Sequence, residues 1–466
     1  MKTKIIAIIG GISFATLFYD QRLGLNCLLL SIFFILILFQ NVKRIQEKWS
    51  ILWSGIGMLL SAAAVTLHGS NMAVAFYFFS SFLFIGCVAQ SQVSSYLAFF
   101  NGVYTTVFGS FHGVFYPDEK TPQESGENRD YSQLARISLI PLGLSVIFIF
   151  VYYQINPIFS NWVDAIDLGV IDYLWFFTAI LGSWITANIS RTATIKEWVE
   201  KDLSTENSLK PSTSISNRLS SIKNEIQTGT VSLIALNVLL VVFLISEFVF
   251  VSNIQEYPAS VLSDAVHAGV YASIASIVLA IVLILIFFRG DLNFVEKNTT
   301  LKNLSYLWIG LNVLLTLSVL FKTYIYIDQY GLSLKRIGVL MYLSLCVIGL
   351  FTTYLKISRK LNFVYLLRRN ATIGFTSLLL FSFINWSSVV TKYNIENEFI
   401  DYHQFSNLLP QNAAELQQYD LLPEVNEFRR SRYISEFDLA EYQDRNWQEY
   451  NGVAASINAQ NNKDDQ

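Results

Sequence analysis

The chain contains little charge for its length. Of its 466 residues, 14% are charged and 53% are hydrophobic, whereas about 25% of the residues of soluble domains are charged. A soluble globular domain with this balance would have too few charged residues to cover its surface. The formal net charge of −3 gives no basic character, so the composition argues against a nucleic-acid partner.

The sequence also lacks the motifs of soluble enzymes and of metal sites. It has no phosphate-binding glycine loop, no His-Glu-x-x-His and no Cys-x-x-Cys. Cysteine is so sparse and scattered that it excludes a disulfide framework and a cysteine metal cluster; the three cysteines are Cys27, Cys87 and Cys346. The four histidines are equally dispersed (His68, His112, His267 and His403). We therefore expect no cofactor, and an enzyme is the less favoured class.

Long apolar stretches make up most of what is present. A stretch such as Val231–Val251 is long enough to cross a hydrocarbon layer of about 30 Å as a helix, which takes about 20 residues. Because the backbone in lipid must satisfy its own hydrogen bonds, a series of such stretches predicts an all-α protein, a polytopic transmembrane helical bundle. The expected spans number about eleven: Ile5–Tyr19, Leu25–Phe39, Ile51–Leu67, Met72–Gln90, Ile137–Ile155, Val170–Ile189, Val231–Val251, Ala265–Phe288, Leu304–Ile325, Ile337–Ile357 and Ala371–Val390.

The distribution of Lys and Arg predicts the orientation of these spans. Short loops rich in Lys and Arg stay in the cytoplasm. The loop Arg191–Thr230 and the loops after Phe288 and Ile357 are basic, whereas Asn156–Gly169 and Ser252–Asp264 have no Lys or Arg. The basic loops should therefore be cytoplasmic, and the tail that follows the last span should lie outside.

One segment leaves the number of spans open. Val93–Pro117 is rich in aromatic residues but also carries several polar residues and three glycines. If it does not cross, the chain has eleven spans and a cytoplasmic N-terminus. If it crosses, the chain has twelve spans and an N-terminus outside.

The last part of the sequence is polar and predicts a different kind of structure. We expect a transmembrane bundle over residues 1–392, an extramembrane, partly amphipathic helical tail over 393–454 and a disordered end over 455–466. Asn412 and Glu415 form a capping-box pattern that predicts a helix start. The tail has too little apolar content for an independent enzyme domain, so we expect it to pack on the membrane face or on a partner protein.

A set of polar residues falls at one depth near the outer ends of neighbouring spans. Ionisable groups at membrane depth are costly and are therefore candidates for a functional site. The set consists of Glu247, His267, Lys322, Tyr330 and Arg336. We expect several of these side chains to touch, with an Arg336–Glu247 pair, either direct or bridged by Tyr330. The alternative is that long side chains near helix ends extend to the lipid headgroups.

Four segments give the chain a family resemblance: LFYDQRLGLN near the start, SDAVHAGVYASIASIVLAI, YIYIDQYGLSLKRIGV and FINWSSVVTKYNI. In these it resembles the bacterial multi-pass membrane family catalogued as domain of unknown function four-one-seven-three, or its relative four-one-five-three. The resemblance covers roughly Ile5–Leu422 and implies a bacterial inner-membrane protein with a periplasmic tail. It points to His267 with Gly269, to Tyr330, Gly331, Leu332 and Arg336, and to Asn385, Tyr393 and Asn394. Ala268 stands where members often have an acid, which weakens any role that needs a His–carboxylate pair there.

Because that family has no established activity, three classes of function stay open. The first is a non-enzymatic scaffold, sensor or partner subunit that meets a periplasmic or membrane protein through its tail. The second is a small-solute or proton-coupled transporter that uses the outer polar residues. The third is an intramembrane enzyme that acts on a lipid-linked substrate with His267 as acid or base. The first class needs no further assumption beyond the lipid bilayer and a protein partner.

Overall fold

The computed structural model is helical in all the parts that it describes. It describes residues 2–39, 49–112, 141, 144–145, 148–164, 172–211, 219–253, 259–288, 291–294 and 298–464. Within these residues there is no β-strand, and extended backbone pairs only in an isolated antiparallel bridge between Ser208 and Leu361. The predicted all-α fold is therefore confirmed.

The chain divides into two compact units. The first unit consists of Met1–Gln21 and Tyr104–Ala193, and the second of Arg22–Val103 and Thr194–Gln466. The described helices of the first unit are α1 (Lys2–Phe18), η2 (Gly109–Phe111), α8 (Pro157–Asp164) and α9 (Tyr173–Ile189). In this unit α1 packs along α9, where Gly182 leaves no room for a side chain against Phe14. Small residues allow such close helix packing in a membrane.

The second unit begins with helices that pack in sequence order. Helix α3 packs against both α2 and α4. The elements are α2 (Leu25–Phe39), α3 (Trp49–His68), α4 (Asn71–Ala89), α5 (Ser95–Phe108), which begins in this unit, and α10 (Lys196–Ser204). Buried hydroxyls join α3 to α4, since Ser61 Oγ lies 2.5 Å from Ser80 Oγ. Such interhelical polar contacts suit a membrane interior, where water offers no alternative partner.

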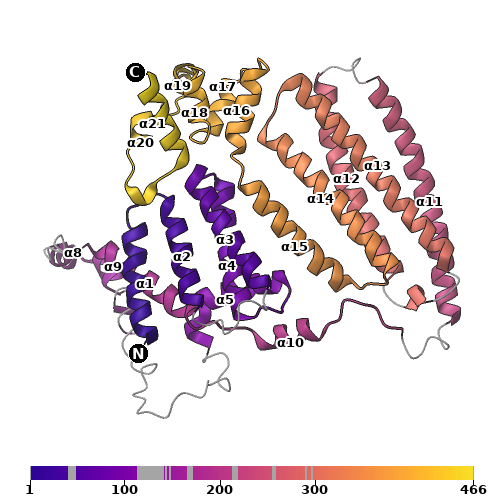
Figure 1. Ribbon diagram of the computed structural model, residues 1–466, viewed down its shortest axis with the longest axis horizontal. Helices are drawn as coiled ribbons and strands as arrows, with labels where there is room; N and C mark the ends of the chain where they lie inside the picture. Colours follow the sequence, from indigo (N-terminus) through magenta and orange to yellow (C-terminus); the bar gives the residue numbers. More distant parts are fainter. Residues whose placement is uncertain are drawn as a thin grey trace, which may run out of the picture. The chain divides into compact units, whose positions relative to one another are not determined.

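Four long helices lie side by side in the same unit (Figure 1). They are α11 (Leu219–Ser252), α12 (Ala259–Phe287), α13 (Thr299–Tyr330) and α14 (Leu334–Ser358), with the short η6 (Asp291–Phe294) between α12 and α13. Helix α13 packs against the other three, and its Leu315 belongs to a core shared with Leu233, Ile284 and Leu350. The apolar side chains Val238, Val242 and Ile245 of α11 are at least 59% exposed, as expected for a helix that faces lipid.

Among the described residues, five helices are long and apolar enough to cross a membrane: α3, α4, α13, α14 and Ile222–Ser252 of α11. Helices α15 (Phe363–Ser382) and α16 (Trp386–Glu396) form a sixth candidate that is bent by 57° at a break. Shorter apolar segments are Lys4–Phe18, Leu25–Leu38, Tyr173–Ile189 and the part Ile274–Phe287 of the 29-residue helix α12. The count of long helices is lower than the expected eleven because several expected spans form helices of only 10–17 residues. Ile137–Ile155 falls partly outside the described residues.

The bend between α15 and α16 corrects one predicted span. We expected Ala371–Val390 to be a single helix. Instead α15 ends at Ser382, and Asn385 begins a new helix by accepting a hydrogen bond from the N–H of Ser388 at 3.3 Å. Asparagine is a strong helix N-cap because its side-chain oxygen satisfies a free backbone N–H.

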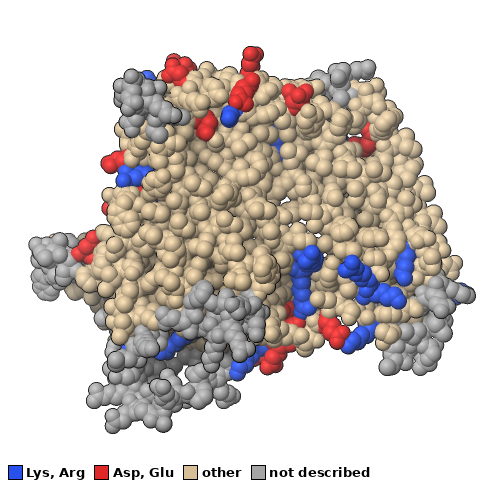
Figure 2. Space-filling view, in the orientation of Figure 1, with Lys and Arg blue, Asp and Glu red and all other residues tan. Residues whose placement is uncertain are grey.

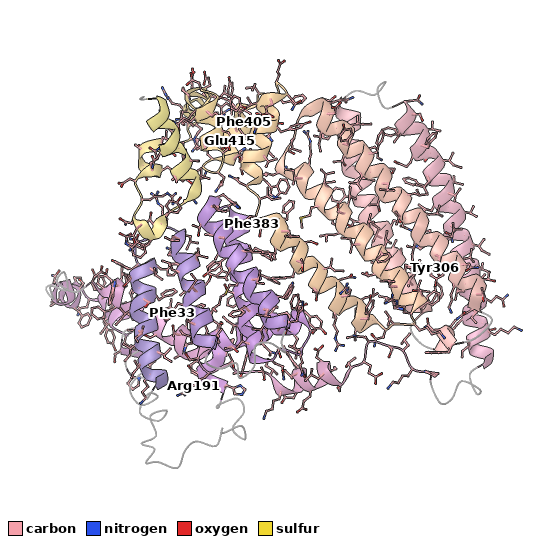
Figure 3. All side chains as sticks on the ribbon, in the orientation of Figure 1. Phe33, Arg191, Tyr306, Phe383, Phe405 and Glu415 are labelled. Atoms are coloured by element: carbon pink, nitrogen blue, oxygen red, sulfur yellow. The ribbon has the colours of Figure 1, made fainter. Side chains whose placement is uncertain are left out.

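The tail folds into a compact set of short helices, which we call the cap. Its elements are α17 (Tyr402–Leu408), α18 (Ala413–Gln418), α19 (Leu422–Ser431), α20 (Leu439–Gln443), η8 (Trp447–Glu449) and α21 (Gly452–Asp464). Phe405, Leu416 and Val425 form one small core, and Figure 3 labels Phe405 within it. Asn412 is the N-cap residue of α18, at the helix start that the capping-box pattern predicts, but its side chain makes no capping hydrogen bond and instead donates to Thr391 and to the carbonyl of Phe405.

The end of the chain differs from the expectation of disorder over 455–466. Helix α21 runs to Asp464, and Ile457 is fully buried against the cap. Its neighbours in that core are Ala413, Ala414 and Val453. The polar composition concealed this helix because few apolar side chains are enough to attach a short segment to a surface that is already folded.

Charged side chains of the second unit gather toward its two ends (Figure 2). Most of the Lys and Arg side chains on this face lie at the end of the unit where α14 ends and α15 begins. Asp and Glu lie at both ends, including the cap, and the surface between carries few charges on this face. An apolar belt between charged ends suggests a membrane-embedded protein.

Candidate functional site

A buried ion pair joins two of the predicted site residues. The ammonium of Lys322 on α13 lies 2.7 Å from Oε2 of Glu247 on α11. The side chain of Lys322 is 2% exposed and that of Glu247 is 16% exposed. The ring of Phe250 lies 5.7 Å from the Lys322 ammonium. A pair this well shielded is costly to desolvate, and it persists because each charge neutralises the other.

Gly269 on α12 makes room for this pair. A methyl group at Gly269 would lie 3.2 Å from the Lys322 ammonium and 3.5 Å from Val319. Helix α12 therefore comes close to the ion pair at a position that the family resemblance singled out. His267 is also on α12, but its side chain lies outside the described residues.

Arg336 does not join Glu247. Within the described residues Glu247 pairs with Lys322, so the expected Arg336–Glu247 contact is wrong. The Arg336 guanidinium donates to the carbonyl oxygens of Tyr330, at 2.8 Å, and of Gly331. It also stacks on the ring of Tyr326 at 4.1 Å. The tight turn after α13 returns Arg336 to the end of that helix, where a cation is favourable beside unpaired carbonyls.

A second cluster of family-motif residues surrounds the same turn. The side chain of Asn394 on α16 accepts from the N–H of Leu332 at 2.7 Å and donates to its carbonyl at 2.9 Å. Gln404 donates to that carbonyl as well, at 2.7 Å. Gly331 has a φ of +76°, and a methyl group there would lie 2.7 Å from Oδ1 of Asn394. The two motif segments are thus parts of one contact, which we call the Asn394 latch.

The other motif residues have structural positions near the cap. Asn385 begins α16 and donates to the carbonyl of Gln411 at 2.8 Å. The carbonyl of Tyr393 accepts from the side chain of Asn397 at 2.8 Å. The side chain of Tyr330 is 40% exposed. The predicted outer pocket is therefore two separate arrangements: the Glu247–Lys322 pair, and the turn closed by Arg336 and Asn394.

Sequence reasoning missed a buried carboxylate at the opposite end of the second unit. Asp202 on α10 is 6% exposed and pairs with Arg368 on α15 at 3.1 Å. It accepts from the N–H of Ser94 at 2.8 Å and from the hydroxyls of Ser94 and Tyr96 at 3.1 Å. Burial acts to raise the pKa of Asp202, but the Ser94 N–H and the Arg368 guanidinium outweigh it and hold this pKa below 3.8. Asp202 is one of five acidic residues in the loop Arg191–Thr230, so its sequence neighbourhood gave no signal of its burial.

The two arrangements limit what the site can do. The Glu247–Lys322 pair is a shielded ion pair, and the Asn394 latch consists of neutral backbone contacts. No group of three or more His, Cys, Asp or Glu side chains suited to a metal ion occurs within the described residues.

The fold and these sites define an all-helical protein whose apolar helices suggest insertion in a membrane. The chain belongs to the family described as "Domain of unknown function (DUF4153)", whose model matches residues 24–419. This is one of the two related families that the sequence resembles, and the match includes both motif segments of the latch. Comparisons with curated proteins and with solved structures give no match.

Proposed function

We propose that the chain is a multi-pass protein of a bacterial inner membrane that works as a non-enzymatic partner subunit. In this proposal the cap is periplasmic and forms a fixed platform on which a second protein docks. The shorter apolar helices complete a bundle of about eleven spans with a cytoplasmic N-terminus.

The attachment of the cap to the bundle supports a fixed platform. The N–H of Arg22 donates to Oε1 of Glu449 at 2.9 Å, and the N–H of Leu25 donates to the carbonyl of Tyr450 at 3.2 Å. Asn412 is fully buried and donates to Thr391 on α16 at 2.9 Å. A surface that is already ordered loses less conformational entropy when a partner binds.

The proposal depends on a single observation, the conformation and exposure of Tyr433. Helix α19 ends in a Schellman motif. The N–H of Ile434 donates to the carbonyl of Arg429, and the N–H of Tyr433 donates to the carbonyl of Arg430. Tyr433 therefore occupies a left-handed position, with a φ of +57°, that glycine usually takes. Its side chain is 100% exposed. A fully exposed aromatic side chain on a strained backbone does not stabilise the fold. Tyrosine is enriched among the residues that contribute most to binding at protein interfaces.

Site-specific photo-cross-linking in intact cells tests this proposal. A photoreactive phenylalanine at position 433 should give a cross-linked product of one discrete additional mass. The matched control is position 198, where Trp198 on α10 is 50% exposed, and this position should not give the same product. The absence of a discrete product at 433, or the same product at 198, would reject the cap as the docking surface.

The Glu247–Lys322 pair favours a second candidate, proton-coupled transport. Both residues lie within helices long enough to span a membrane, and buried ionisable pairs occur along proton and solute pathways. Purified protein in vesicles with an internal pH dye should then move protons, and Glu247→Gln with Lys322→Met should stop the movement. Proton movement by the doubly substituted protein at the unsubstituted rate would exclude this role for the pair.

A further inference from the structure

A cavity of about 310 Å³ lies within the second unit, between the cap and the ends of α3 and α15. It opens to the surface, and its volume is at the lower end of the range for small-molecule sites, which is about 300–1,000 Å³. Its polar and apolar lining includes His68, Phe383, Asn385, Glu415, Val453 and Ser456. Figure 3 labels Glu415 in the cap and Phe383 at the end of α15. Neither the Glu247–Lys322 pair nor Asn394 of the latch lines this cavity.

Glu415 brings an unused acceptor to the cavity. One carboxylate oxygen, Oε1, accepts from the hydroxyl of Ser388. The other, Oε2, is buried and has no hydrogen-bond partner within the described part of the chain. Leaving a buried polar group unpaired is destabilising, and more so when the group is charged. The lining residues described contain no Lys or Arg, so the carboxylate has no cation of the chain beside it in the cavity.

His68 brings an unused donor to the same cavity. Its side chain is 4% exposed. Nδ1 accepts from the N–H of Ser70 at 3.3 Å, so the proton of the neutral imidazole is on Nε2. The His68 ring lies near the backbone of Ser382 and Phe383, but Nε2 forms no hydrogen bond of good geometry to any described residue. Buried polar atoms of native proteins are rarely left unpaired, so each needs an explanation.

The other polar side chains of the cavity form hydrogen bonds within the chain. Asn385 donates to the carbonyl of Gln411 and accepts from the N–H of Ser388. Gln411 donates to the carbonyl of Gly69 at 3.5 Å, and Ser456 donates to the carbonyl of Val453 at 2.7 Å. The two unused groups therefore define the ligand. Glu415 requires a donor, best a cation, and His68 requires an acceptor.

We propose that this cavity binds a small ligand that carries a primary ammonium group and a nearby oxygen acceptor, which is the chemistry of ethanolamine. The ammonium donates to Glu415, and the oxygen accepts from Nε2 of His68. Leu67, Phe383 and Val453 cover the methylene groups. The same chemistry occurs in a free amino alcohol and in the headgroup of phosphatidylethanolamine. This site goes beyond the proposed docking function and does not depend on it.

Binding to the purified full-length protein tests the proposal in two arms. The first titrates free ethanolamine by calorimetry in detergent. The second compares lipid nanodiscs of phosphatidylethanolamine and phosphatidylcholine by native mass spectrometry, because the choline group has no N–H donors. Saturable binding in the first arm identifies a free amine as sufficient. Retention of phosphatidylethanolamine alone identifies the lipid. No saturable binding in either arm, or equal retention of the two lipids without ethanolamine binding, would overturn the site.

Two substitutions assign such binding to the cavity. Glu415→Gln keeps the size of the side chain and should weaken binding at least tenfold, whereas Glu424→Gln on α19, outside the cavity lining, should leave it unchanged. If Glu415→Gln fails to fold, Ser456→Leu offers the same test because it fills the cavity while Glu415 remains. Unchanged binding by the folded cavity variants would contradict the proposal.

Discussion

Asn394 on α16 pairs with both backbone groups of Leu332, as a neighbouring strand would, at 2.7 and 2.9 Å. This contact fixes the turn between α13 and α14 to the helix that leads into the cap. It requires an amide side chain at 394, because only an amide supplies an acceptor and a donor side by side. It also requires glycine at 331, where φ is +76° and space is limited by Asn394 itself. The latch thus explains why two distant motif segments occur together in the sequence.

Removal of the Asn394 amide should destabilise this junction. Asn394→Ala leaves the N–H of Leu332 without its partner, which should lower the free energy of unfolding by about 2 kcal/mol. The matched control is Asn397→Ala, since Asn397 is exposed and bonds only the carbonyl of Tyr393 among the contacts described. Thermal unfolding in detergent compares the two, and equal effects would show that the latch is not a special contact.

The Glu247–Lys322 pair should respond differently to single and double substitution. Glu247→Leu leaves a buried ammonium unpaired and should cost about 3–5 kcal/mol, and Lys322→Leu should cost a similar amount. Replacing both together should recover most of the loss, because no uncompensated charge remains. Unfolding free energies of the three variants provide the measurement. Additive losses in the double variant would mean that the two charges do not interact.

Asp202 should make the stability of the protein dependent on acid pH. Its pKa in the folded state is below 3.8, so its ionised form contributes stability above about pH 4 that is lost as pH falls through the folded-state pKa. Asp202→Asn should cost about 2 kcal/mol at pH 7 and should flatten the stability curve below pH 4. Glu206→Gln is the control, because the Glu206–Lys210 pair is exposed and an exposed ion pair contributes little to stability. A parallel loss at all pH values would exclude Asp202 as the titrating group.

The proposed orientation can be tested by cysteine labelling. The native cysteines are all buried, so an introduced cysteine should dominate the reaction with an impermeant maleimide. In spheroplasts, a cysteine replacing the exposed Ser431 of the cap should react, and one replacing the exposed Glu206 should react only after lysis. The reverse pattern would place the cap in the cytoplasm and reject the proposed topology.

Local patterns in the sequence predicted the helical elements well, but predicted their contacts less well. Apolar length predicted α11 and α14, and the capping box predicted the start of α18 at Asn412. These depend on neighbouring residues alone. The partner of Glu247 depends on helix rotation, which loop charges do not define, and a local turn placed Arg336 elsewhere. His68 and Glu415 are distant in sequence, and only the folded cap brings them to one cavity.

Tyr433 provides the most direct test of the account, through a pair of glycine substitutions. Asp420 occupies the equivalent position in the Schellman motif that ends α18, with a φ of +55°. Tyr433→Gly and Asp420→Gly should each leave stability unchanged or raise it by up to about 1 kcal/mol, because glycine removes the left-handed strain. We predict that co-purification of the partner identified by cross-linking falls at least tenfold with Tyr433→Gly and stays unchanged with Asp420→Gly. Equal co-purification by both variants, at the level of the unsubstituted protein, would contradict the claim that the cap docks a partner through Tyr433.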